Sequence, residues 1–200
     1  MYEIISEKAD VEEILSERKG VQILKVILED GNMAKAINYT FLAGQISKGE
    51  RVNLNTTAMC LNLGTGGYHF VINKINDNVE DRENKSQILS KDGHIMKLRY
   101  TPLQFRTLSL SEKNGLFHKE LKEFILLDNM PVIFIPLHSL LAPLLISYNN
   151  LMEKKKTLYI MTEGGSLPLE LSKIVARLKE KKLLDVSITI GNSFGGDYEA

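Results

Sequence analysis

The sequence predicts two folds in series: a small antiparallel β-barrel over residues 1–110, then an α/β domain with a short parallel sheet over residues 111–200. Two patterns support this prediction. Up to residue 110, short β-branched and aromatic runs alternate with glycine turns at the spacing typical of small barrels. After residue 110, apolar runs of strand length alternate with helical periodicity, which is typical of βαβ units.

In the first domain, residues 1–19 are polar, and Val11, Ile14 and Leu15 indicate one short helix. Asp30-Gly31 is a hairpin signal. Residues 76–92 are rich in charge and poor in apolar side chains, so we expect a mobile loop there. Strands are expected wherever β-branched runs lie between turns, with the last one completing the barrel: residues 21–28, 33–41, 51–55, 68–75 and 94–110.

In the second domain, helices and strands alternate. Helices are expected at residues 116–127, 140–152 and 167–182, and strands at 132–137, 157–162 and 185–190. Ser139 and Ser166 are the expected N-caps of the last two helices. Parallel strands joined by right-handed crossovers bring their carboxyl ends to one edge of the sheet.

Composition excludes several classes of protein. Lys+Arg and Asp+Glu number 25 each, so a general basic footprint for nucleic acid is missing and no nucleic-acid partner is expected. The single cysteine, Cys60, fits a reducing cytoplasm, and residues 1–20 contain no secretory h-region. Residues 130–148 lack Asp, Glu, Lys and Arg, but prolines and His138-Ser139 interrupt them. A buried strand and helix explain this pattern better than a membrane span does.

The predicted site lies at the carboxyl edge of the parallel sheet, where open α/β sheets bind ligands. Glycines there let a backbone approach a ligand, and helix amino termini bind anions. We therefore expect a small anionic or phosphorylated ligand. The alternative is that the glycines only form tight turns. The candidate ligand-binding residues follow the last two strands: Thr162, Gly164, Gly165, Ser166, Ser193, Gly195 and Gly196.

Three side chains at this edge are candidates for catalysis: His138, Glu163 and Asp197. His138 follows a predicted strand and could carry a proton, although a hydrogen-bonded structural histidine explains it equally well. The two carboxylates would repel an anion, so their presence suggests a divalent cation or a sugar hydroxyl. No zinc site is expected, because the other histidines share no metal spacing and Cys60 has no second cysteine near it.

Residues 63–69 form a glycine-rich stretch that resembles an anion-binding loop. It precedes a strand rather than a helix, so it does not fit a dinucleotide fingerprint, and a hairpin turn is favoured. Thr65 or His69 would join the site only if the barrel packed against the edge of the parallel sheet.

Several stretches of the chain carry a family resemblance, and they include residues 53–58, 63–71, 93–104, 161–168 and 194–200. On these stretches the chain resembles an uncharacterised bacterial family, one of the domains of unknown function found in Gram-positive genomes. The resemblance covers most of the chain and implies no activity. Members of that family look longer than 200 residues.

The leading functional hypothesis is an enzyme or enzyme-like protein that binds its ligand at the edge described above. The alternative is a non-catalytic binding or scaffold module that acts through the barrel and through oligomerisation. Residues 197–200 suggest an N-cap and the start of a helix, so the chain is expected to be a fragment. A βαβ sheet that ends on an uncovered strand exposes apolar surface, and a homo-oligomer is therefore expected.

Overall fold

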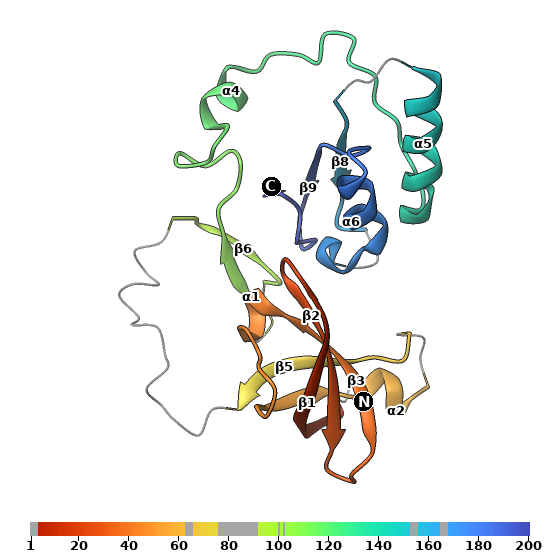
Figure 1. Cartoon of the computed structure of the whole chain (residues 1–200). Coiled ribbons are helices and arrows are strands. Elements are labelled where there is room, and N and C mark those ends of the chain that lie inside the picture. Colours follow the sequence, from red (N-terminus) through yellow and green to blue (C-terminus); the bar gives the residue numbers. More distant parts are fainter. Residues whose placement is uncertain are drawn as a thin grey trace. The chain divides into compact units, whose positions relative to one another are not determined.

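The computed structural model of the chain describes residues 4–62, 66–75, 92–99, 101, 103–152, 156–164 and 168–200 (Figure 1). The chain divides into two compact units, Met1–Leu89 and Ser90–Ala200. The sequence places this division about twenty residues later, at residue 110. The difference arises because a hairpin that was expected to complete the barrel belongs to the second unit.

The first unit contains a closed barrel with the strand order β1-β2-β3-β5-β4. All neighbouring strands are antiparallel except β3 and β5, so the barrel is mixed rather than purely antiparallel. This order is that of the OB fold. The elements are β1 (Ser6–Arg18), β2 (Val21–Leu28), β3 (Met33–Tyr39), α1 (Thr40–Ala43), β4 (Arg51–Asn55), α2 (Thr57–Cys60) and β5 (His69–Ile75).

The predicted helix over residues 1–19 is wrong, because this segment forms β1, the longest strand of the barrel. Ala9 and Val11 alternate into the core, as a strand requires. The register with β2 then shifts twice, between Val11 and Glu13 and between Ile14 and Ser16. Such bulges bend a strand, which lets β1 pair with both β2 and β4. A strand with these bulges can hold Val11, Ile14 and Leu15, whose spacing in the sequence is that of a helix.

The second unit contains a three-stranded parallel sheet, in the order β10-β9-β8, and a separate antiparallel hairpin of β6 and β7. Its elements are β6 (Ile95–Lys97), β7 (Phe105–Thr107), α4 (His118–Glu123), the 3₁₀ turn η2 (His138–Leu140), α5 (Leu141–Leu151), β8 (Leu158–Met161), the 3₁₀ turn η3 (Leu169–Leu171), α6 (Lys173–Glu180), β9 (Val186–Thr189) and β10 (Tyr198–Glu199).

One face of the parallel sheet is covered by α5 and α6, which lie side by side (Figure 1). Apolar side chains from both helices meet Met161 of β8 in a single core. This core positions the carboxyl end of β8 against the beginning of α6. Its buried members are Leu141, Leu145, Met161, Leu169, Val175, Leu178 and Leu184.

Two predicted elements of this unit are wrong. Residues 132–137 form no strand: Pro131, just before them, and Pro136, within them, lack the N–H groups that a sheet needs. The third parallel strand is instead β10, where residues 197–200 were expected to begin a helix. The helix predicted over residues 116–127 is confined to α4.

Two other predictions concern loops and membrane spans. Residues 76–91 of the predicted mobile loop lie outside the described residues. Among the helices that the structure describes, none is both long enough and apolar enough to cross a membrane. The uncharged run at residues 130–148 is accordingly divided between an irregular segment, η2 and part of α5.

Candidate functional site

The turns that follow β8 and β9 are joined at the carboxyl edge of the sheet. The hydroxyl of Ser193 donates to the carbonyl oxygen of Thr162 at 2.9 Å. The side-chain amide of Asn192 donates to the carboxylate of Glu163. Gly164 is exposed, and a Cβ built on it would meet no atom within 4 Å. The structure therefore brings Thr162, Glu163 and Ser193 together and leaves open space beside Gly164.

Gly195 and Gly196 lie in the same loop but pack against the protein itself. Gly195 has a φ of +89°, and a Cβ there would lie 2.4 Å from Cγ of Glu170 and 2.7 Å from its backbone nitrogen. A Cβ on Gly196 would lie 2.8 Å from the carbonyl oxygen of Tyr198. These two glycines are needed for close backbone packing, so for them the alternative of a structural turn has direct support.

The fully buried side chain of Lys97 stabilises the loop after β9 at this edge. The ammonium group of Lys97 donates to the carbonyl oxygens of Ser193, at 2.5 Å, and Thr189, at 3.1 Å. It also lies 2.5 Å from a carboxylate oxygen of Glu199. With these three acceptors around it and no exposure to solvent, Lys97 organises the loop after β9 and is not available to an incoming anion.

His138 links three elements on the helix-covered side of the sheet. Its Nε2 lies 2.7 Å from Oγ of Ser172, and its Nδ1 lies 3.0 Å from the hydroxyl of Tyr159 in β8. The same Oγ accepts the backbone N–H of Val175 and so caps α6. Burial lowers the pKa of His138 below 6.5, so its imidazole is neutral at pH 7 and can accept a proton.

Asp197 belongs to a different hydrogen-bond network. Its carboxylate accepts the ammonium group of Lys179 at 2.6 Å, and the backbone N–H and hydroxyl of Ser187 at 2.8 and 2.9 Å. Burial works to raise the pKa of Asp197, but the hydrogen bonds from Lys179 and Ser187 outweigh it and hold that pKa below 3.8. Through these hydrogen bonds the carboxylate of Asp197 connects the start of β10 with β9 and α6.

The three residues proposed for catalysis therefore have separate partners. His138 binds Tyr159 and Ser172, Glu163 binds Asn192, and Asp197 binds Lys179 and Ser187. In the part of the chain that the structure describes, no group of three or more His, Cys, Asp or Glu side chains could hold a metal ion. Thr65, Gly165 and Ser166 lie outside the described residues.

His69 lies in the other unit, on β5 of the barrel. Its side chain is buried, and its Nδ1 has no hydrogen-bond partner among the described residues. Burial lowers the pKa of His69, while the nearby carboxylate of Glu7 acts in the opposite direction. An unsatisfied buried nitrogen costs stability.

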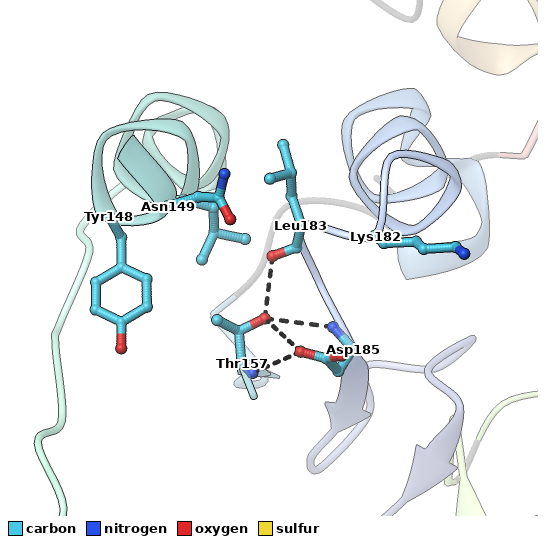
Figure 2. A pocket seen from close by; sticks show the side chains of 7 residues that line it. Tyr148, Asn149, Thr157, Lys182, Leu183 and Asp185 are labelled. Atoms are coloured by element: carbon cyan, nitrogen blue, oxygen red, sulfur yellow. Dashed lines mark hydrogen bonds between the residues drawn. The ribbon is translucent and has the colours of Figure 1, made fainter. Parts of the chain in front are cut away.

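A small cavity lies at the opposite, amino-terminal edge of the sheet, between α5 and the turn after α6 (Figure 2). Thr157 lines this cavity and donates its hydroxyl to the carbonyl oxygen of Leu183 at 3.0 Å. The backbone N–H of Thr157 donates to the carboxylate of Asp185 at 2.8 Å. The cavity volume is about 10 Å³, which has room for about one water molecule, so a phosphorylated ligand does not fit there.

Sequence reasoning missed four residues that shape the edge: Lys97, Tyr159, Ser172 and Asn192. Ser172 had a usable signal, since it directly precedes a helical run and serine is a preferred N-cap. Lys97 and Tyr159 had none, because a charged or phenolic residue inside a strand gives no indication of its partner.

The comparisons with known proteins give one match. Residues 35–200 match the model of a protein family described as a protein of unknown function, DUF3866. None of the curated proteins and none of the solved structures compared with the chain matches it.

Proposed function

The chain belongs to the DUF3866 family, and we propose that its Rossmann-like α/β unit is an enzyme or enzyme-like protein for a small anionic or phosphorylated ligand. The ligand site is the carboxyl edge of the parallel sheet. The observation that carries the proposal is the pair of hydrogen bonds that join His138 to the hydroxyls of Tyr159 and of Ser172, the N-cap of α6. A neutral imidazole that bonds one hydroxyl and is oriented by a second group at its other nitrogen matches the arrangement of a base beside a nucleophile.

The contacts of η3 support a position of this histidine network near the proposed edge. The backbone N–H of Leu169 donates to the carbonyl oxygen of Phe194 at 2.8 Å, which ties η3 to the loop after β9. Ser172 follows η3 directly. A ligand beside Gly164 would therefore approach from the end of the sheet at which α6 begins.

Two features favour an anion at this place. The amino end of α6 carries the positive end of the helix dipole, which is worth roughly 0.3–1 kcal/mol to an anion. Lys173 is exposed in the first turn of α6 and pairs with no carboxylate among the described residues. Glu163 opposes an anion, unless a divalent cation accompanies it. Mg²⁺ commonly binds one or two carboxylates together with substrate phosphates, so a Mg²⁺-bound phosphorylated ligand suits this edge.

Thermal unfolding with candidate ligands tests the proposal. The compounds to test, each with and without Mg²⁺, are inorganic phosphate, a nucleoside diphosphate and a sugar phosphate. We expect at least one of them to raise the midpoint of thermal unfolding. Ligand at about a hundred times its dissociation constant adds about 2.7 kcal/mol. A chain that responds to none of these compounds would contradict the proposal.

Two variants locate the binding. Gly164→Val places a side chain in open space, so it should fold normally and yet block the ligand. Lys181→Ala, at the exposed end of α6, should bind as the parent does. If Gly164→Val retains the full midpoint shift, the ligand site lies elsewhere.

The alternative is a non-catalytic binding module that acts through the barrel. Lys25 and Lys35 lie directly opposite each other on β2 and β3, and neither forms an ion pair with a described residue. Like charges in this arrangement destabilise a sheet. Glu13 of β1 lies opposite Lys25 and offsets part of this effect, and an anionic partner beside Lys35 would relieve the rest. Weaker binding of the phosphorylated ligand by Lys35→Glu, with Gly164→Val unaffected, would favour this alternative. Either function suits a reducing cytoplasm, since Cys60 is exposed and is the single cysteine of the chain.

A further inference from the structure

The second unit carries a run of exposed apolar side chains between α4 and α5. Residues 124–137 run as an irregular trace (Figure 1), and Asp128 is their single charged residue. We call these residues the apolar segment. Nine of its large apolar side chains are more than half exposed: Phe124, Ile125, Leu126, Leu127, Met130, Val132, Ile133, Phe134 and Leu137.

The size of this surface is that of a protein interface. A large apolar side chain exposed to this degree presents on the order of 100 Å² to water, so nine of them present roughly 900 Å². Monomeric proteins rarely expose a contiguous apolar patch of more than a few hundred Å². A standard interface buries about 800 Å² on each partner, and the exposed apolar side chains of the segment together have an area of that order.

One residue of the apolar segment packs against the core that includes Met161 of β8, a strand with an open outer edge. This residue is Ile135, and Tyr159 of β8 packs against the same core cluster. Leu158 and Ile160 project from the other face of β8 and are about half exposed. No described strand pairs with the outer edge of β8, whereas Ser109 bridges to β10 at the opposite edge. The open edge of β8 therefore offers unpaired backbone groups and two more exposed apolar side chains to a partner.

We propose that a second copy of this chain covers this surface, with the two apolar segments packed across a two-fold axis beside the two β8 edges. A two-fold axis places a surface against itself, so the surface must be complementary to itself. An apolar surface with one charge meets this condition, because almost nothing on it repels its own copy. It also lacks the clustered charge that selects a partner of opposite charge.

Sedimentation velocity on the full chain tests the proposal. At a concentration on the order of 10 µM, well above a micromolar dissociation constant, the parent should sediment with twice its 22.6 kDa mass. Phe134→Glu and Ile125→Glu alter side chains that are 92% and 89% exposed, so the fold should survive while dimerisation weakens by at least about tenfold. Circular dichroism verifies the fold of both variants.

Met33→Glu is the matched control, since Met33 is 65% exposed but lies on the barrel. It should dimerise as the parent does. A parent that is monomeric under these conditions would overturn the proposal and would mean that something other than a second copy covers the segment. Dimerisation of both glutamate variants at parental strength would overturn it equally.

Discussion

The ammonium group of Lys97 lies 2.5 Å from the carboxylate of Glu199, and no part of the lysine side chain is exposed. This pair ties β6 to β10, which is 102 positions further along the chain (199 − 97). The carboxylate of Glu199 also accepts the hydroxyl of Thr189 and the backbone N–H of Gly195. The pair therefore fixes the loop that forms one side of the proposed ligand site.

Lys97→Ala should destabilise the second unit by about 3 kcal/mol, the lower end of the range for breaking a buried ion pair. The reason is that Glu199 and two carbonyl oxygens lose their buried donor, although Glu199 keeps its other two hydrogen bonds. Urea unfolding measures the loss.

Arg51→Ala is the control for this prediction. Arg51 and Asp10 form a pair at 3.5 Å with side chains that are 51% and 63% exposed, and such pairs contribute below about 1 kcal/mol. The prediction for Lys97 is wrong if the two substitutions cost the same.

Gly195→Ala should destabilise the chain by more than about 1 kcal/mol, because a positive φ is unfavourable for alanine. The backbone nitrogen of Glu170, 2.7 Å from the new Cβ, adds a clash that a side-chain rotation cannot relieve. Gly164→Ala should stay within about 0.5 kcal/mol of the parent, since its Cβ enters open space. Thermal unfolding compares the two, and equal stabilities would show that the loop after β9 adapts freely.

The contrast between these glycines shows how far the sequence predicted the site. Strand ends and turns could be predicted from β-branched runs and glycines, and the two turns at the carboxyl edge do meet. Which glycine faces open space and which one packs against Glu170 depends on tertiary contacts that the local sequence does not encode.

The errors in the predicted fold have similar causes. Val11, Ile14 and Leu15 are spaced in the sequence as in a helix, so periodicity alone favoured a helix. Two bulges in β1 let a strand accommodate this spacing. Residues 132–137 have the composition of a buried strand, yet they are exposed and lie outside the sheet, with Pro131 before them and Pro136 among them. In each case the pairing partner decides the structure, and a single sequence does not reveal it.

The carboxylate of Asp197 should make stability depend on pH in the acidic range. The pKa of Asp197 in the folded chain lies below its ordinary value of 3.8, so the unfolded chain binds a proton first as the pH falls. The stabilisation is therefore complete above about pH 3.8 and is lost as the pH falls through the folded pKa.

Asp197→Asn should cost about 1 kcal/mol at pH 7, because the ion pair with Lys179 is about one-third exposed. The variant should lose less stability than the parent between pH 7 and pH 3 in urea unfolding. Parallel losses in the two proteins would contradict this assignment.

The imidazole of His138 should titrate below 6.5, because burial disfavours its charged form. The unfolded chain then takes up the proton first, so the stabilisation is complete above about pH 6.5 and falls as the pH drops towards the folded pKa. NMR titration of the ring protons measures the midpoint directly. His138→Gln should also reduce the loss of stability between pH 7 and pH 5, and a ring midpoint above 6.5 would contradict the buried neutral imidazole.

The most direct measurement is an NMR titration of the full parent chain with inorganic phosphate and Mg²⁺, following backbone amides and histidine rings. The account predicts shifts confined to residues 162–164, 172–174 and 191–196 and to the ring of His138. Two results would contradict a ligand site at the carboxyl edge of the parallel sheet. One is a set of shifts confined to the barrel, around Lys25, Lys35 or His69. The other is the absence of shifts both at saturating phosphate and with a phosphorylated nucleotide.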